Sequence, residues 1–282
     1  EGKHLWPRFR FDTEQHDGGS YVAMGNPLEY VGALPAGKTT GKLFIHNVPH
    51  RASDETLRAW IGGALRAVAA FYGDHISREL TILLVPVPGT TEPGVFGTVM
   101  RRGFPSVIIY FGADSVAPAM SNDWVAIHEL FHIGNPIIED RIPWLIEGFT
   151  TYYQDILRVR TGALTAEQAW GDLHDGFRRF CQPNSGVSLE EESKSLRRTY
   201  HYTRVYWGGA CLAFVADVSI RARSKGQRGL DDVLLGLRAR SLNGPEPAEL
   251  VFSHSLPISP SFSFAMTVSL STIEATPDVR QL

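Results

Sequence analysis

The pentapeptide His-Glu-Leu-Phe-His at residues 128–132 constrains the fold of this chain more than any other feature of its sequence. The apolar residues around it predict a helix over residues 123–133. Residues four positions apart lie on the same face of a helix, so His128 and His132 are able to reach the same metal ion. Catalytic zinc usually takes three protein ligands and a water molecule, so the motif requires a third ligand elsewhere.

A second helix supplies the candidate for this ligand. Gly-Asn-Pro at residues 134–136 ends the first helix, and a proline opens an aromatic-rich helix over residues 143–158. Two antiparallel helices joined by a short loop would place Glu147 beside the histidines, and His, His and Glu are the zinc ligands of thermolysin. Glu139 and Asp140, in the loop, are the competing candidates, although both are better explained as solvent-facing caps of the second helix.

The order of the predicted elements indicates an α+β fold, with a small mixed sheet followed by a mainly helical half. Residues 1–50 read as a β-rich segment, the end of a truncated β domain, and residues 51–240 as the catalytic domain. Residues 241–282, rich in Ser and Pro, are expected to be a tail or a fragment of a further module. The catalytic domain has expected helices at 53–72, 165–180, 203–223 and 230–240, and expected strands at 80–87, 95–100 and 106–111.

Composition narrows the function of the 282-residue chain. Its net charge of −3 offers no broad basic surface, so nucleic acid is not an expected partner. Its longest apolar runs fall far short of the roughly 20 residues that span a bilayer, so we expect no transmembrane segment. The chain starts at Glu1 without a leader, so any signal peptide or upstream domain is expected to lie outside the given sequence. Nothing in the sequence indicates an oligomeric state.

Two stretches resemble one family of enzymes. The zinc motif, the fourteen residues between His132 and Glu147, and the sequence Glu-Gly-Phe-Thr-Thr-Tyr-Tyr from Glu147 resemble the glycyl aminopeptidase-like branch of the gluzincin zinc metallopeptidases. Tyr-Trp-Gly-Gly-Ala from Tyr206 is similar to the helix that begins with the catalytic tyrosine of those enzymes, although Gly208 replaces the usual lysine and removes an anchoring charge. The resemblance covers about residues 42–240.

This resemblance implies a thermolysin-like zinc peptidase domain, preceded by remnant β structure, that hydrolyses peptides and is periplasmic or secreted. Zn²⁺ would be bound by His128, His132 and Glu147. Glu129 is expected to take a proton from the attacking water and to deliver it to the leaving amine, and Tyr206 to donate a hydrogen bond to the oxyanion.

Several neighbouring residues are alternatives or supports for these roles. Tyr200, His201 and Tyr202 are close enough in sequence to replace Tyr206, although they are more simply explained as packing residues. Metal-bound histidines normally have carboxylate, carbonyl or similar outer partners. Thr151, one helical turn after Glu147, is expected to fill part of that role.

The sequence leaves the mode of peptide cleavage open. An aminopeptidase needs an acidic side chain for the substrate's free amine, and residues 93–113 contain none. Gly97 and Thr98 lie in the strand expected to line the cleft and are expected to pair with an extended peptide by strand addition. Aminopeptidase and endopeptidase action both fit this arrangement. A non-catalytic peptide-binding protein that retains the fold is the alternative of a different class, and the presence of both Glu129 and Tyr206 argues against it.

Overall fold

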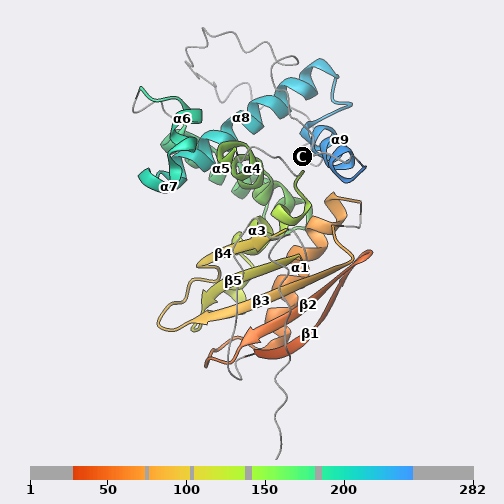
Figure 1. Cartoon of the computed structure of the whole chain (residues 1–282), viewed down its shortest axis with the longest axis vertical. Coiled ribbons are helices and arrows are strands. Elements are labelled where there is room, and N and C mark those ends of the chain that lie inside the picture. Colours follow the sequence, from red (N-terminus) through yellow and green to blue (C-terminus); the bar gives the residue numbers. More distant parts are fainter. Residues whose placement is uncertain (1–27, 74–75, 102–104, 137–141, 182–185, 244–282) are drawn as a thin grey trace, which may run out of the picture.

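The computed structural model describes residues 28–73, 76–101, 105–136, 142–181 and 186–243. Figure 1 shows a sheet in the lower half of the molecule, a group of helices in the upper half, and helix α3 (Val125–Gly134) between them. The predicted mixture of a small sheet followed by helices is confirmed at this level. The metal-binding motif lies on α3, where the two halves of the molecule meet.

The sheet has five strands in the order β1-β2-β3-β5-β4. β2, β3 and β5 are parallel to one another, whereas β1 and β4 are antiparallel strands at the two edges. Alternate residues of β3, Leu80, Ile82 and Leu84, are buried, as the two-residue period of a strand requires. The strands are β1 (Leu28–Ala36), β2 (Thr39–His46), β3 (Glu79–Val87), β4 (Phe96–Met100) and β5 (Ser106–Gly112).

The domain boundary expected at residue 50 falls inside this sheet. β1 and β2 precede the boundary, yet β2 pairs in parallel with β3, which follows it. β1 and β2 also contact helix α1 (Asp54–Phe71), which follows the boundary. Parallel strands need a long crossover connection, here α1, so the pairing joins segments that are distant in sequence. Residues 1–27 of the expected β-rich segment, and residues 244–282 of the expected tail, lie outside the described residues.

The long helices predicted from periodicity are confirmed to within a few residues at each end. Helix α1 begins after Ser53, whose hydroxyl accepts a hydrogen bond from the Thr56 amide, and α5 begins after the predicted capping box of Thr165 and Gln168. Three short helices were too short to show a period. Besides α1 and α3, the helices are α2 (Ala117–Met120), α4 (Pro143–Arg160), α5 (Ala166–Phe180), α6 (Leu189–Lys194), α7 (Leu196–Thr199), α8 (Tyr202–Arg223) and α9 (Leu230–Asn243).

Helices α4 and α8 cross in direct backbone contact through two glycines. A Cβ atom added to Gly209 would lie 1.8 Å from the carbonyl oxygen of Trp144, and one added to Gly148 would lie 2.4 Å from the Gly209 backbone. Glycine is therefore required on both helices for this close approach. The crossing brings Glu147, next to one glycine, close to Tyr206, which lies one turn before the other.

Helix α8 is the one described helix that is long and apolar enough to cross a membrane by length and composition. It packs against α4, α5, α6 and α9. Its buried Asp217 accepts hydrogen bonds from the Tyr152 hydroxyl at 2.9 Å and from the Leu230 amide at 2.7 Å. These contacts bury part of α8, whereas Leu212 and Val218 on the same helix are exposed.

Candidate metal centre and active site

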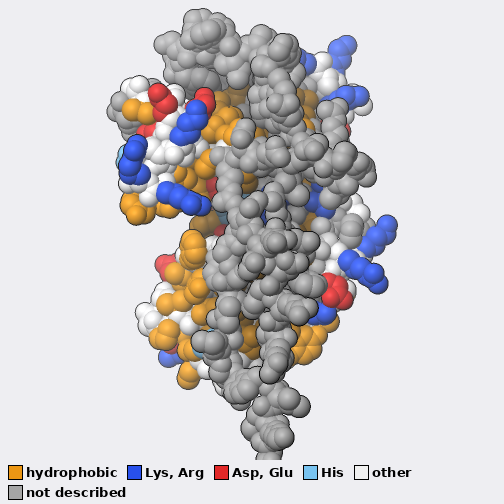
Figure 2. All heavy atoms as spheres, viewed as in Figure 1, with side chains coloured by type: hydrophobic (Ala, Val, Ile, Leu, Met, Phe, Trp, Pro, Cys, Tyr) orange, Lys and Arg blue, Asp and Glu red, His pale blue; other side chains and the backbone are white. Residues whose placement is uncertain are grey.

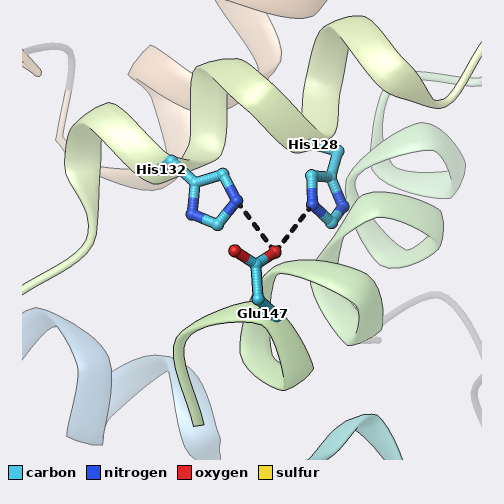
Figure 3. A group of neighbouring side chains, drawn as sticks. All are labelled: His128, His132 and Glu147. Carbon is cyan, nitrogen blue, oxygen red and sulfur yellow. Dashed lines mark hydrogen bonds and ion pairs between the residues drawn. The ribbon is translucent and has the colours of Figure 1, made fainter. Parts of the chain in front are cut away.

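His128 and His132 on α3 and Glu147 on α4 converge on one point. Their potential ligand atoms all lie within 4.8 Å of one another. The Oε2 atom of Glu147 is 3.2 Å from the Nε2 atom of each histidine. Figure 3 shows both rings pointing from α3 toward the carboxylate. The two helices therefore bring together the three residues singled out in the sequence, whereas Glu139 and Asp140 lie outside the described residues.

Hydrogen bonds to α4 orient the His128 ring. The side-chain oxygen of Gln154 lies 2.9 Å from Nδ1 of His128. An amide oxygen accepts only, so Nδ1 carries the proton and Nε2 keeps its lone pair. Nε2 faces Glu147 at 3.2 Å, and from this position a neutral imidazole would offer its lone pair to a metal ion.

The ring of His132 is oriented in the same way. The Thr150 hydroxyl donates to the Ile146 carbonyl at 2.8 Å and lies 3.3 Å from Nδ1 of His132. Because the Thr150 hydroxyl donates its proton to the Ile146 carbonyl, its oxygen accepts a hydrogen bond from Nδ1 of His132. The lone pair of a neutral His132 ring is then on Nε2. Nε2 of each histidine and a carboxylate oxygen thus meet at one point, where a metal ion would replace the contacts that they make with one another. This donor set fits the two-histidine, one-glutamate site of a catalytic zinc ion.

The outer partners of the histidines are Thr150 and Gln154, and the expectation for Thr151 was wrong. The hydroxyl of Thr151 is buried and has no hydrogen-bond partner among the described residues. Thr150 and Gln154 follow Glu147 by three and seven positions, which places all three on one helix face. Thr151, four positions after Glu147, satisfies the same helical rule, so the spacing alone does not distinguish it from Thr150.

The charges at the site favour the ionised form of Glu147, the form that binds a metal ion. Burial raises the pKa of Glu147, but His132 and His128 lower it more, so the net pKa lies well below the usual range and the carboxylate stays charged. The pKa of Glu129 is raised by burial, against the opposing effect of His132 and His128. Glu129 is therefore a stronger base than an exposed glutamate.

Strand β4 passes directly over Glu129. A Cβ atom added to Gly97 would lie 2.2 Å from Cγ of Glu129, so only glycine fits at this point of the strand. Side chains alternate along a strand, so Gly97 and Val99 face α3 while Phe96 and Thr98 face the other side of the sheet. Gly97 therefore adjoins the site directly, whereas the side chain of Thr98 faces away from it.

Tyr206, on α8, packs against His128. Its ring stacks on that of His128, with centroids 6.1 Å apart and an interplanar angle of 14°. Burial raises the pKa of the Tyr206 hydroxyl, and the neighbouring charges of Glu147 and Glu129 raise it further. The hydroxyl is therefore a proton donor across the neutral range. Its competitors Tyr200, His201 and Tyr202 are exposed.

The residues at four-residue intervals after Tyr206 on α8 are not all buried. Ala210 is buried and Phe214 packs against the core, but Val218 is 47% exposed. Each step of four residues turns a side chain by about 40° away from the starting face. The buried positions therefore shift to Ala213 and Asp217 further along the helix.

An arginine side chain lies beside Gly208, the position at which the sequence analysis noted a missing lysine. A Cβ atom at Gly208 would lie 2.5 Å from Nη1 of Arg204, so the Arg204 guanidinium occupies the space beside the glycine. Nε of Arg204 is 3.4 Å from Oε2 of the buried Glu192 on α6. This ion pair supplies a charged contact from α8 to α6, although the sequence predicted that such an anchor is lost.

Part of the chain matches the sequence model of a known enzyme family. Residues 135–207 match the model of the M61 glycyl aminopeptidase family. Over this segment the chain is similar to the glycyl aminopeptidases, which confirms the resemblance noted in the sequence. The matched segment contains Glu147 and Tyr206, and the zinc motif directly precedes it. No curated protein sequence matches the chain.

Two solved structures are similar to this chain. An aminopeptidase N family protein from Idiomarina loihiensis has a TM-score of 0.62 and 18% identity, over 76% of this chain and 41% of that one. An M1 zinc metallopeptidase from Deinococcus radiodurans has a TM-score of 0.46 and 17% identity, over 75% of this chain and 45% of that one. The first similarity shows a shared fold. The chain spans less than half the length of either protein.

Proposed function

We propose that this chain is a zinc-dependent peptidase with a thermolysin-like arrangement of its site. The observation that carries the proposal is the convergence of His128, His132 and Glu147, with both imidazoles oriented by α4 to present Nε2 lone pairs. Two histidines and one glutamate leave a fourth position of a tetrahedral zinc ion for water, which is the pattern of catalytic rather than structural sites.

The other residues of the site have the chemistry that peptide hydrolysis needs. A zinc ion at this position would supply Lewis acidity to a water molecule and to the scissile carbonyl. Glu129, half-buried and with a raised pKa, accepts a proton from the attacking water and delivers it to the leaving amine. The Tyr206 hydroxyl, which stays protonated, donates a hydrogen bond to the oxygen that gains negative charge.

The substrate backbone is proposed to pair with β4. This strand is at the edge of the sheet order, and Gly97 places its backbone directly against Glu129. An extended peptide added to β4 would thus hold its scissile bond beside the general base, without a requirement for particular side chains. The family match favours removal of an N-terminal residue, whereas the lack of acidic residues on β4 favours cleavage within a chain. The family resemblance also leads us to propose a periplasmic or secreted location.

The direct test of this function is hydrolysis of a mixed peptide library by the zinc-loaded protein. We expect peptide bonds to be cleaved, and we expect a chelator to abolish cleavage and added zinc to restore it, because the ligands require a metal ion to act. Blocking the N-termini by acetylation separates the two modes, since an aminopeptidase loses these substrates and an endopeptidase keeps them. Zinc binding without any cleavage would favour the non-catalytic peptide-binding alternative.

Tyr206→Phe is expected to lower kcat by about 100- to 1,000-fold, the usual loss for one oxyanion-stabilising donor. Zinc content and KM should change little, because the hydrogen bond to the substrate oxygen strengthens mainly in the transition state. Steady-state kinetics and metal analysis check this. Tyr202→Phe, which removes an exposed hydroxyl one turn earlier on α8, is the matched control and should keep near-normal kcat. A Tyr206→Phe variant with near-normal kcat would reduce Tyr206 to a packing residue.

A further inference from the structure

A series of buried hydrogen bonds connects His132 to helix α1. The Thr150 oxygen, which lies 3.3 Å from Nδ1 of His132, also accepts a hydrogen bond from Nδ2 of Asn135 at 3.0 Å. The side-chain oxygen of Asn135 accepts in turn from the hydroxyl of Tyr72, the residue that ends α1, at 3.1 Å. Each of these four side chains is at most 9% exposed. We call them the Asn135 network.

The direction of each hydrogen bond in the Asn135 network follows from one group that can only accept. The Ile146 carbonyl takes the proton of the Thr150 hydroxyl at 2.8 Å, so Thr150 accepts from its other neighbours. The nitrogen of the Asn135 amide therefore faces Thr150, and its oxygen faces Tyr72. Burial raises the pKa of the Tyr72 hydroxyl, which keeps its proton and donates it to Asn135. Every donor in the network thus faces an acceptor.

The side chain of Asn135 is not needed to end helix α3. The backbone amide of Asn135 donates to two carbonyls of the last turn, at 3.2 and 3.3 Å, and its backbone carbonyl accepts from Arg101. Most residues could make these backbone contacts. The two polar atoms of the asparagine side chain are needed only for the contacts with Thr150 and Tyr72.

Packing holds the Tyr72 end of the network in place. A Cβ atom added to Gly134 would lie 2.0 Å from Cε2 of Tyr72, so the Tyr72 ring packs directly on the last residue of α3. The guanidinium of Arg238, on α9, lies 4.8 Å from the centre of the same ring and donates to the Gly134 carbonyl. The Tyr72 hydroxyl therefore has a defined position from which to hold Asn135.

The network connects the two halves of the molecule. α1 packs against the sheet and α3, whereas α4 belongs to the group of helices in the upper half of Figure 1. Figure 2 shows the surface hollowed on one side between these halves. The Asn135 network is one of the interior connections between them, and it ends on a candidate metal ligand.

We propose that Asn135 is a positioning residue, which holds the Thr150 oxygen against Nδ1 of His132 and so directs Nε2 toward the place where the metal ion would bind. A threonine on a helix has two favourable side-chain rotamers. The hydrogen bonds with Asn135 and Ile146 select the rotamer that reaches His132. This inference rests on the metal site of the proposed function, but it does not depend on peptide cleavage.

The competing explanation is that Asn135 and Tyr72 only stabilise the contact between α1 and α3. A purely structural role predicts lower thermal stability of the metal-free protein with unchanged zinc affinity. It also predicts that the effect of changing Asn135 does not depend on whether Thr150 is present. A positioning role predicts weaker zinc binding that depends on Thr150, because Asn135 reaches the ligand only through it.

The test measures zinc affinity by competition with a chelator, without any peptide, in a double-mutant cycle. We expect Thr150→Val to lower the affinity by about 10- to 100-fold, as loss of an outer partner of a ligand usually does. Asn135→Leu should lower it by about 2- to 10-fold, the contribution of one hydrogen bond. The variant with both changes should bind zinc within about 2-fold of Thr150→Val alone, because the two residues act on His132 as a unit.

Two tyrosine variants extend the test. Tyr72→Phe keeps the ring and its packing and removes only the hydroxyl, so it serves even if Asn135→Leu does not fold. It should weaken zinc binding by a smaller factor than Asn135→Leu. Tyr152→Phe is the matched control, because it removes a buried hydroxyl that donates to Asp217 at 2.9 Å, outside the network. It should lower thermal stability and leave zinc affinity unchanged.

Unchanged zinc affinity in both Asn135→Leu and Tyr72→Phe would overturn the proposal, as would losses that add in full when Asn135→Leu and Thr150→Val are combined. The measurement is separate from hydrolysis. A parent protein that binds zinc but cleaves no peptide would therefore overturn the peptidase function alone. A parent protein that binds no zinc would overturn both.

Discussion

Glu129→Gln is expected to lose about 10²- to 10⁴-fold in kcat, or roughly 3–5 kcal/mol of transition-state stabilisation, and to keep its zinc. Glutamine has the same shape as glutamate but takes no proton from water. Glu129 is adjacent to His128 in sequence, yet it is not one of the three residues whose ligand atoms converge. Its replacement therefore removes the base and leaves the metal ligands in place.

Metal analysis together with kinetics on the best library peptide checks this expectation. The fold should be unaffected, because the change removes a charge that burial disfavours, and thermal unfolding of the metal-free variant should match that of the parent. Glu55→Gln is a suitable control, since it changes the same side chain at an exposed position of α1. Normal hydrolysis by the Glu129→Gln variant would mean that another group activates the water, or that the activity comes from a contaminant.

Glu147→Ala is expected to remove most of the bound zinc and with it the hydrolytic activity. Loss of a hydrogen-bonding partner outside the ligand shell usually costs 10- to 100-fold in metal affinity, and loss of a ligand itself should cost more. The two histidines then remain as an incomplete site. Metal content after dialysis against a zinc-buffered solution measures the effect.

Two comparisons make this experiment decisive. Gln154→Leu removes only an outer partner of His128 and should lower zinc affinity by about 10- to 100-fold, less than Glu147→Ala. Glu139→Ala and Asp140→Ala change the competing candidates for the third ligand and should bind zinc normally. Stoichiometric zinc in Glu147→Ala, together with zinc loss in one of these two, would transfer the ligand role to the loop.

The helix pair of the site was predictable from the sequence because its signals are local. The spacing of His128 and His132 places both on one helix face, and glycine and proline mark where the helices end and begin. Glu147 then follows from the reversal between the two helices. Thr150 and Gln154 were missed, although their spacing from Glu147 follows the same helical rule.

Contacts between segments far apart in the sequence were not predictable in this way. The parallel pairing of β2 with β3 depends on a crossover through α1. The sequence of β2 does not indicate which strand lies beside it. The approach of Gly97 to Glu129, and the backbone contact of Gly148 with Gly209, likewise depend on how whole elements pack. Each glycine is visible in the sequence, but its partner is not.

The sequence by itself determined the chemistry of this protein: two histidines, two glutamates and a tyrosine on helices whose limits local signals define. The tertiary structure decided their surroundings. It placed the ring of Tyr206 on His128, directed β4 over Glu129 and joined Tyr72 to His132 through Asn135 and Thr150. The physical reason is that helix periodicity and capping act over a few residues, whereas the packing of α3, α4, α8 and the sheet is a property of the whole buried core.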